Sequence, residues 1–464
     1  MYEYRKGFTI VELLIVIVVI GVLAAVITIS YTGITQKANI ASIKSDLRQS
    51  GNLLSMYKVV NNQYPDSINL VNNGQGLDSS SGVSYSYTKI SDSEFCLTAK
   101  HEGLTNVGYF INQDNNTPTL GFCPGDAPPL TMDNTAVSTV AGAGVQGFED
   151  GPVATAQFHR PHNIDIDDIS GNIYVADVYN NSVRQVTPSG VVSTIAGSLT
   201  PGSADGVGTN ATFYRPSDVA VDSSGNIFVT DMQNHRIRKI TPSGVVSTIA
   251  GSGMSGFADG VGTAAQFNTP AGLSVDADGN IYVADTMNHR IRKITPAGVV
   301  STVAGSGATG YGNGGFADGS IDTAKFKMPN GIDVDGSGNI YVADTYNYRV
   351  RKVSPSGIVS TVAGSGVSGF LDGTWDTAKF NLVLGVAIDR SGNIYVADHS
   401  NNRVRKVSPS GIVSTVAGSG VSGYVDGPSS AARFKTVQGV AVDQLGTIYI
   451  ADAYNYRIRK VYLK

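Results

Sequence analysis

The stretch Asn280-Ile281-Tyr282-Val283-Ala284-Asp285 occurs six times, with small variations, after residue 136 of the chain. Successive copies are spaced 54, 54, 59, 54 and 54 residues apart, and they end at Asp177, Asp231, Asp285, Asp344, Asp398 and Asp452. Repetition at a nearly fixed period indicates an array of equivalent supersecondary units that pack on their neighbours. This array therefore decides the fold of most of the chain.

One unit contains four short runs in which apolar and polar residues alternate, and turn-forming residues separate these runs. In the third unit the predicted strands are 272–276, 281–284, 290–294 and 299–304. Four antiparallel strands joined by tight turns form one blade, and radial repetition of blades leaves only short, protected sheet edges. The repeat thus predicts a closed ring of blades.

The units also resemble a known family. Residues 280–293, Asn-Ile-Tyr-Val-Ala-Asp-Thr-Met-Asn-His-Arg-Ile-Arg-Lys, are similar to the NHL repeat, and all six units match over about 325 residues. The resemblance implies a mainly β fold, a six-bladed NHL-type β-propeller over residues 137–464. Some NHL propellers bind RNA, but each unit here also supplies about three aspartates, so we expect no nucleic-acid partner.

The order of the strands predicts how the ring closes. The array opens with a strand of the fourth type at 137–141 and ends with a strand of the third type at 457–461. The last blade therefore lacks a fourth strand of its own. We expect the opening strand to complete this blade, because the pairing removes the only free sheet edge.

Composition excludes several other classes of protein. The chain has 464 residues, 41% hydrophobic residues and a net charge of −4, which argues against a wholly disordered chain and against a basic nucleic-acid-coating protein. Its 55 glycines and 17 prolines favour many short strands. Two cysteines are too few for a disulfide scaffold or a cysteine-based zinc site, and six histidines limit any histidine-rich site. We assign no metal and no cofactor.

The N-terminal 36 residues form a separate segment. Residues 1–7 are a charged leader, and the run from Leu13 to Gln36 has 24 residues without a charge. As a helix this run is about 36 Å long, enough to cross a bilayer and too long for the apolar part of an ordinary signal peptide. Arg5 and Lys6 precede the run, so we expect a single pass through the inner membrane with the later domains outside.

Glu12 is the unusual residue of this segment. A carboxylate near the bilayer centre costs about 2.5 kcal/mol or more unless it finds a partner or reaches interfacial water. Residues 6–14, Lys-Gly-Phe-Thr-Ile-Val-Glu-Leu-Leu, resemble the class III signal of type IV prepilins and pseudopilins. The resemblance implies that prepilin peptidase cleaves between Gly7 and Phe8 and that Phe8 becomes the methylated N-terminus. The Glu12 carboxylate would then pair with the N-terminal amine of a neighbouring pilin subunit.

The segment 37–125 is expected to form a pilin-like α+β head. A long N-terminal helix that includes the membrane segment 8–36 would continue into the head, because an apolar face is formed by Ile40, Ile43, Leu47, Leu54 and Tyr57. Short alternating runs at 83–87, 95–97 and 108–111 predict strands of a small sheet.

Cys96 and Cys123 are the only cysteines of the chain. After export they can form a disulfide worth about 3–4 kcal/mol in the chain-entropy model, or they can remain two buried thiols. Residues 126–136, rich in proline at their start, are expected to form a linker between the head and the ring.

A polar pattern, Asp-x-x-Asn-x-Arg, follows the second strand of five units. In the third unit it consists of Asp285, Asn288 and Arg290, and we expect the carboxylate to cap the turn amides and to meet the arginine. The first unit has Ser182 in the arginine position, which puts the pair in doubt there. Asp-Gly loops before the first strands are predicted turn formers, with calcium binding as the alternative; their aspartates are Asp150, Asp205, Asp259, Asp318, Asp372 and Asp426.

A candidate ligand surface lies where the units differ. Strand direction places the long connections between units on one face of the ring, and long loops on a rigid scaffold are frequent binding sites. On this face, His159 and Tyr214 lie near polar residues that differ from unit to unit. The predicted ligand residues are Arg160, His162, Asn163, Arg215, Ser217, Asp218, Lys327, Asn330, Trp375 and Gln438. Plain sequence drift on a solvated rim is the alternative.

These features predict a non-enzymatic cell-surface protein, a minor or tip type IV pilin-like subunit that displays the propeller for adhesion or for binding a protein or glycan. Prepilin peptidase, other pilin subunits and the membrane are its expected partners. The alternatives are a membrane-tethered propeller enzyme, such as a lyase or hydrolase, and an uncleaved sensor ectodomain. We assign no catalytic residue, because only His162 lies at a predicted axial position and no Ser-His-Asp grouping has a suitable spacing.

Overall fold

The structure is a computed structural model that describes residues 39, 41–70, 77, 79–81, 83–89, 95–101, 108–112, 119–120, 135–307 and 309–463. The chain divides into two compact units, Met1–Pro128 and Pro129–Lys464. The predicted leader, the predicted membrane segment 8–36 and the residues Gly7, Phe8 and Glu12 lie outside the described residues. Within the described ranges, no helix is long and apolar enough to cross a bilayer.

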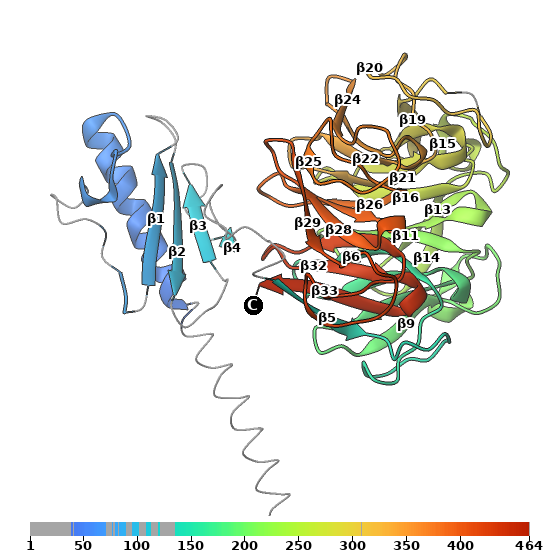
Figure 1. The fold of residues 1–464 in the computed structure, drawn as a ribbon, viewed down its shortest axis with the longest axis horizontal. Coiled ribbons are helices and arrows are strands. Elements are labelled where there is room, and N and C mark those ends of the chain that lie inside the picture. The colour runs from blue at the N-terminus through green and yellow to red at the C-terminus, as the bar shows by residue number, and fades with distance from the viewer. Residues whose placement is uncertain are drawn as a thin grey trace, which may run out of the picture. The chain divides into compact units, whose positions relative to one another are not determined.

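The first unit pairs one helix with one small sheet. The helix covers residues 41–61 and is followed by the 3-10 helix η1 (Ile68–Leu70). The sheet has the order β1-β2-β3-β4, and its strands are β1 (Val83–Lys89), β2 (Phe95–His101), β3 (Gly108–Asn112) and β4 (Thr119–Leu120) (Figure 1). Ile43, Leu47 and Leu54 of the helix are buried in one cluster with Phe95 and Leu97 of β2. The helix thus buries the face that its apolar spacing predicts.

Cys96 lies in β2 and is buried. Its predicted partner, Cys123, lies outside the described residues, as does most of the linker 126–136. The disulfide therefore stays a prediction.

The second unit is a ring of six blades (Figure 1). Each blade contains four main antiparallel strands, and the first strand of each lies at the centre of the ring. The blades, in chain order, are β6 (Pro161–Ile166), β7 (Ile173–Asp177), β8 (Ser182–Val186) and β9 (Val192–Gly197); β11 (Pro216–Val221), β12 (Ile227–Asp231), β13 (Arg236–Ile240) and β14 (Val245–Ala250); β16 (Pro270–Val275), β17 (Ile281–Asp285), β18 (Arg290–Ile294) and β19 (Val299–Ala304); β21 (Pro329–Val334), β22 (Ile340–Asp344), β23 (Arg349–Val353) and β24 (Ile358–Ala363); β26 (Val383–Ile388), β27 (Ile394–Asp398), β28 (Arg403–Val407) and β29 (Ile412–Ala417); β31 (Val437–Val442), β32 (Ile448–Asp452), β33 (Arg457–Leu463) and β5 (Thr135–Ala141).

Short elements complete the blades. Five blades have a two-residue strand on the outer edge: β10 (Gly206–Val207), β15 (Gly260–Val261), β20 (Gly319–Ser320), β25 (Gly373–Thr374) and β30 (Gly427–Pro428). In the first blade the single bridge between Gly151 and Val192 takes this place. Short 3-10 helices follow each second strand, namely η3 (Val178–Asn180), η5 (Met232–Asn234), η7 (Thr286–Asn288), η8 (Thr345–Asn347), η9 (His399–Asn401) and η10 (Ala453–Asn455), and two more lie in connections between blades, η4 (Gly208–Asn210) and η6 (Gly262–Ala264). The outer strands shorten the exposed edge of each sheet.

The ring closes with strands from its two ends. β5, at the start of the ring, lies between β33 and β30 in the last blade. Its pairing with β33 extends from Leu463 opposite Thr135 to Ile458 opposite Ala141. The strand begins two residues earlier than the repeat predicts, and it has the place in the last blade that the strand order predicts.

Each junction between neighbouring blades contains an apolar cluster. Between the second and third blades, Phe228 and Ile237 pack in one cluster with Leu273 and Val283. A phenylalanine from the connection before the first strand is fully buried in every blade: Phe158, Phe213, Phe267, Phe326, Phe380 and Phe434. Because the junctions are equivalent, each blade stabilises both of its neighbours.

We call the mouth face the side of the ring on which the first strand of each blade begins. In the last blade, Val437 at the start of β31 pairs with Asp452, which in turn pairs with Arg457 at the start of β33. At the other end of this blade, Leu463 pairs with Thr135. Thr135, the first described residue of the ring, therefore lies on the side opposite the mouth face.

The residue that ends each turn helix on the mouth face has a left-handed backbone, with φ between 49° and 54°: Asn181, His235, His289, Tyr348, Asn402 and Tyr456. In four blades its side chain accepts an amide hydrogen from the next blade. The pairs are Asn181 Oδ1 with Arg215 N at 3.0 Å, His235 Nδ1 with Thr269 N at 3.0 Å, His289 Nδ1 with Met328 N at 3.0 Å, and Asn402 Oδ1 with Thr436 N at 2.9 Å. A ring nitrogen that accepts a hydrogen bond must be unprotonated. Burial lowers the pKa of both histidines, which favours this neutral form.

The double substitution His235→Asn/His289→Asn is expected to preserve the free energy of unfolding at pH 7.5 and to reduce its decline below pH 6.5. Asparagine makes the same contact at 181 and 402, and it tolerates the left-handed backbone. In the wild type, unfolded histidines with a pKa near 6.5 bind protons before the folded ones, so falling pH lowers stability by up to about 1.4 kcal/mol per pH unit for each histidine.

Urea unfolding of both proteins between pH 5 and 7.5 measures this effect. The other titrating groups are common to both proteins and cancel in the difference between the two curves. Parallel curves would contradict the role given to the two ring nitrogens.

Candidate functional site

Six arginines of the third strands are completely buried, one in each blade: Arg184, Arg238, Arg292, Arg351, Arg405 and Arg459. Each pairs with the aspartate that ends the second strand and with the aspartate of the Asp-Gly loop in the same blade. We call each such group of one arginine and two aspartates an arginine hub.

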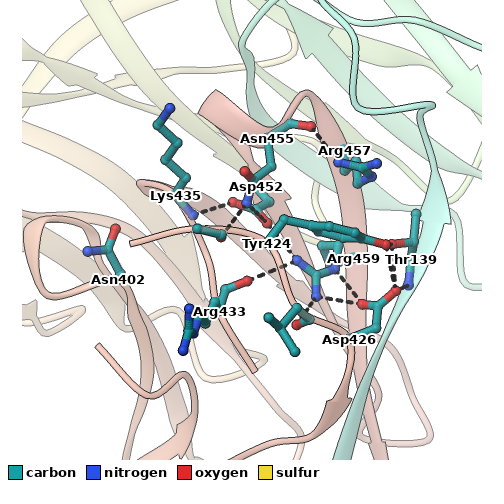
Figure 2. A network of polar contacts seen from close by, with 12 residues as sticks. Thr139, Asn402, Tyr424, Asp426, Arg433, Lys435, Asp452, Asn455, Arg457 and Arg459 are labelled. Atoms are coloured by element: carbon teal, nitrogen blue, oxygen red, sulfur yellow. Dashed lines mark hydrogen bonds and ion pairs between the residues drawn. The ribbon is translucent and has the colours of Figure 1, made fainter. Parts of the chain in front are cut away.

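Figure 2 shows the hub of the last blade. Arg459 donates from Nη1 to Asp452 Oδ2 at 2.7 Å and from Nε to Asp426 Oδ1 at 2.9 Å. Asp452 Oδ1 accepts the backbone N–H of Lys435 at 2.8 Å, and Asp426 Oδ2 accepts that of Thr139 in β5 at 3.1 Å. The hub thus fixes the turn on the mouth face, the connection before the blade and the strand that closes the ring.

The arginine that meets the turn aspartate is not the one that the sequence pattern predicts. In the third blade, Asp285 Oδ2 accepts from Asn288 Nδ2 at 2.8 Å and from Arg292 Nη1 at 2.7 Å. Arg290 instead stacks on Phe257, with its guanidinium carbon 4.0 Å from the ring centre, and donates to the Asn288 carbonyl. The functional spacing is therefore seven residues rather than five, because Arg290 directly faces Asp285 in the strand register while Arg292 reaches back from two residues further along.

This spacing also corrects the expectation for the first blade. Ser182 replaces the stacked arginine there, but Arg184 pairs with Asp177 at 2.8 Å and with Asp150 at 2.6 Å. The hub is present in all six blades. The Asp-Gly carboxylates bind arginine, and within the described ranges no group of three or more histidine, cysteine, aspartate or glutamate side chains is placed to hold a metal ion.

A cavity of about 80 Å³ lies on the axis of the ring, and residues from the first strands of all six blades line it. Three of its lining residues are Asp165, Asp218 and Asp333, and each carboxylate accepts an amide hydrogen from the next blade. The donors are Val221 N at 2.8 Å, Leu273 N at 2.9 Å and Ile388 N at 2.8 Å, respectively. These carboxylates therefore tie neighbouring first strands together along the axis.

Desolvation raises the pKa of all three aspartates. It raises the pKa of Asp165 to about 7 and that of Asp333 to about 6, against the opposing effect of the amide donors. It also raises the pKa of Asp218 well above its usual value. Carboxyl groups with a pKa near neutrality can exchange protons at physiological pH.

His162 lies at the entrance of this cavity and connects three blades. Its Nδ1 is 2.9 Å from the carbonyl oxygen of Ser217, which can only accept, so Nδ1 carries the proton. The Nε2 atom then accepts from the Gln438 side-chain amide. Burial is the main cause that lowers the pKa of His162 to about 4; Arg160 and His399 contribute to the shift, and the hydrogen bond to Ser217 opposes it. This ring is therefore neutral at physiological pH.

Two buried acceptors, at the positions that correspond to His162 in other blades, have no hydrogen-bond partner within the protein. They are Gln438 Oε1, on the last blade, and Asn330 Oδ1, on the fourth. The Gln438 residue is 6% exposed, and its nitrogen is committed to His162. Burying an acceptor without a hydrogen-bond donor costs about 1–3 kcal/mol of stability.

A row of alternating aromatic and guanidinium groups continues from the entrance around the mouth face. Arg160 stacks between Tyr454, at 4.3 Å, and Tyr179, at 5.0 Å, measured from its guanidinium carbon to the ring centres. On the same Tyr179 ring stacks Arg215, at 4.9 Å. Arg160 Nη1 also donates to the Tyr179 hydroxyl at 2.9 Å. We call Tyr454, Arg160, Tyr179 and Arg215 the arginine–tyrosine row.

Three known families match parts of the chain. The prokaryotic N-terminal methylation motif matches residues 4–28, the NHL repeat matches 380–407 and 434–461, and the SMP-30/gluconolactonase/LRE-like region matches 194–366. This chain carries an N-terminal methylation motif and an NHL propeller. The three matches agree with the six-bladed ring and with the signal at residues 6–14.

Curated proteins are similar to part of this chain. Protein SUPPRESSOR OF QUENCHING 1, chloroplastic, of Arabidopsis thaliana is 27% identical over 281 residues, 58% of this chain and 27% of that protein. NHL repeat-containing protein 2 of Homo sapiens is 28% identical over 338 residues, 64% of this chain and 46% of that protein. The chain spans less than half the length of these relatives.

A solved structure from Bacteroides thetaiotaomicron VPI-5482, a protein of unknown function, superimposes with a TM-score of 0.58 at 18% identity. The match covers 84% of this chain and 92% of that chain. At this level of identity the likeness shows the fold alone.

Five of the ten predicted ligand residues of the NHL propeller lie at its mouth. Arg160, His162, Arg215, Asn330 and Gln438 lie at the entrance or in the arginine–tyrosine row. Deeper in the ring, the axial cavity is lined by Asn163 and Asp218.

Three predicted ligand residues have other surroundings. Ser217 is completely buried and donates to the Ala271 carbonyl at 2.6 Å, so it fixes the strand rather than a ligand. Lys327 donates its backbone N–H to Asp344 and lies near His289, away from the arginine–tyrosine row.

Trp375 was expected near the mouth, and this expectation is wrong. It follows β25 on the outer edge of the fifth blade, where its side chain lies over Gly411 and leaves no room there for a larger residue. Ile321 covers Gly357 of the fourth blade in the same way. Trp375 therefore covers the outer turn of its own blade.

Four residues of the NHL propeller site were missed by the sequence analysis: Tyr179, Tyr454, Asp165 and Asp333. The two tyrosines occupy the middle position of their turn helices, where the other blades have Gln233, Met287, Tyr346 and Ser400. This variation from blade to blade is the signal that could have identified them.

Proposed function

We propose that this protein is a minor or tip type IV pilin-like subunit whose NHL propeller binds an extracellular ligand at its mouth without catalysing a reaction. The methylation motif at 4–28 carries the proposal, because such motifs suggest processing by prepilin peptidase and assembly with other pilin subunits at a membrane or surface. Gly7, Phe8 and Glu12 supply the cleavage site, the methylated residue and the carboxylate that pairs with a neighbouring subunit.

The first unit supports a pilin-like head. Its helix at 41–61 packs an apolar face on a small antiparallel sheet, as the predicted long N-terminal helix would require. The ring beyond the linker has more than 300 residues, and a group of this size on every subunit would crowd a filament shaft. A minor subunit or a tip subunit avoids this crowding.

The substitution Gly7→Ala is expected to block maturation, so that the purified protein keeps its seven leader residues. The added methyl group stands at the cleaved bond, where close approach of the backbone is needed. Mass spectrometry of the N-terminus measures the result: methylated Phe8 in the wild type and Met1 in the variant. Surface material sheared from cells is expected to contain the wild-type protein and to lack the variant.

Gly33→Ala, in the same uncharged run, is the matched control and is expected to mature normally. A wild-type protein that retains Met1 would overturn the pilin assignment and favour the uncleaved tether. A mature protein that forms the bulk of sheared filaments would overturn the minor or tip assignment.

The second candidate is a membrane-tethered enzyme. It is favoured by the match of residues 194–366 to the SMP-30/gluconolactonase/LRE-like region and by the axial carboxyl groups with a pKa near neutrality. Turnover of a lactone that requires a stoichiometric metal ion in the purified protein would favour this candidate.

A further inference from the structure

The guanidinium groups of Arg160 and Arg215 are held in place by aromatic rings rather than by carboxylates. Ion pairs between described residues include the six hub arginines and neither of these two. Stacking on Tyr179 and Tyr454 fixes the plane of each group and leaves N–H edges for a ligand. A planar guanidinium with unsatisfied N–H groups suits a carboxylate, which it can bind with two parallel hydrogen bonds.

Two acceptors at the mouth ends of first strands would bind a different group. Gln438 Oε1 and Asn330 Oδ1 are buried without a donor, and His162 offers none, because its only proton goes to Ser217. An ammonium group is disfavoured as the donor by the positive charge of Arg160, which is close enough to lower the pKa of His162. Hydroxyl groups supply neutral donors.

We infer that the mouth binds an acidic saccharide. Its carboxylate is held by Arg160 with Arg215, and its hydroxyl groups donate to Gln438 Oε1 and Asn330 Oδ1. The two acceptors belong to the last and the fourth blade, so they approach a ligand from different sides of the axis. A sugar ring carries hydroxyl groups around its whole edge and can reach both, whereas a peptide end has its amide donors along one strand. The inference rests on the proposed binding role of the mouth and names the class of ligand.

The full-length protein, purified in detergent, is titrated calorimetrically with an oligomer of galacturonic acid and with a neutral galactose oligomer of the same length. We expect binding of the acidic oligomer, weakened by added salt, and at least tenfold weaker binding of the neutral one. Arg160→Gln is expected to weaken binding of the acidic oligomer about tenfold or more, the loss of a charge-assisted pair, and to reduce its dependence on salt. Gln438→Met removes the acceptor at nearly constant volume and is expected to weaken binding about fivefold to tenfold.

Arg433→Gln is the matched control, because Arg433 is an exposed arginine in the connection before the last blade. This variant is expected to bind the acidic oligomer as tightly as the wild type does. Thermal unfolding of every variant shows whether the ring is intact. The inference is overturned by equal affinity for the two oligomers, by an Arg160→Gln variant that folds and binds as the wild type does, or by tighter binding of a peptide with a free carboxyl end or of single-stranded DNA.

These results are separable from the pilin assignment. A protein that matures at Phe8 and reaches the surface but does not bind the acidic oligomer overturns the ligand class alone. A protein that binds the oligomer and keeps Met1 overturns the pilin assignment alone.

Discussion

Replacing Arg292 by methionine is expected to lower the free energy of unfolding of the ring by about 3–5 kcal/mol, because the change leaves the buried Asp285 carboxylate without a cation. Both side chains are completely inaccessible to solvent. Methionine has a similar length and is apolar, so the loss comes mainly from the unpaired charge. Urea unfolding monitored by far-ultraviolet circular dichroism measures the change.

Arg290→Met is the matched control in the same strand. Arg290 is only half-buried and stacks on Phe257, so its loss is expected to cost about 1 kcal/mol or less. Adding Asp285→Asn to Arg292→Met removes the stranded charge and is expected to recover part of the stability. Equal costs for Arg292→Met and Arg290→Met would show that the arginine hub is not the main support of the blade.

Deleting residues 135–141 from the full chain is expected to abolish cooperative unfolding of the ring and to cause aggregation. The deletion removes the strand between β33 and β30, and with it two ladders of backbone hydrogen bonds. It also exposes the apolar surface that Val137 and Ala141 cover, where burial of the valine alone contributes about 2 kcal/mol. Free edges and exposed apolar surface promote association between chains.

A rescue experiment tests whether position in the chain matters. Leu463 and Thr135 are opposite each other at the same end of the blade, so a four-residue turn such as Thr-Pro-Ser-Gly can join them. Adding this turn and a copy of 135–141 after Leu463, in place of Lys464, is expected to restore cooperative unfolding to the deleted chain. Deleting the seven residues 126–132 instead, within the predicted linker, is expected to leave unfolding unchanged. A ring that unfolds cooperatively without any copy of 135–141 would contradict closure by this strand.

The repeat was sufficient to predict the ring. A stretch such as Asn280–Asp285 recurs with the same turn residues around it, and each copy must bury the same faces against its neighbours, so one correct assignment of strands applies six times. The missing fourth strand of the last blade followed from the same count. In the first unit, the spacing of the apolar residues along the helix was sufficient to predict a buried face that includes Ile43, Leu47 and Leu54.

The arginine hubs were not predicted in full, because their partners are joined by strand register rather than by spacing in one turn. Arg290 is the arginine nearest to Asp285 in sequence, but Arg292 is the one that reaches the carboxylate and a second aspartate 33 residues earlier. The Asp-Gly loops were interpreted as turns or calcium sites, because the sequence does not show which residue pairs with their aspartates. Their partner lies in another strand.

The sequence predicted those site residues whose position depends on one first strand. It did not predict the contacts that form between residues of neighbouring blades. His162 and Gln438 could be placed near the axis from strand direction, but the proton positions that leave Gln438 Oε1 unsatisfied depend on contacts between three blades. The placement of Trp375 failed because the long connection first passes the outer edge of its blade before it returns to the axis.

The closing strand has a mechanical consequence. Thr135 lies at one end of β5 and the mouth lies at the opposite face. If the N-terminal part were anchored and the mouth bound a surface, as proposed above, tension between them would act along this strand. In that direction all the hydrogen bonds to both neighbouring strands are loaded at once and oppose sliding of the strand. If the strand were peeled away from one end, the same bonds would break one after another. A subunit joined to its support in this way would hold under a pull that rapidly unzips a hairpin loaded from one end.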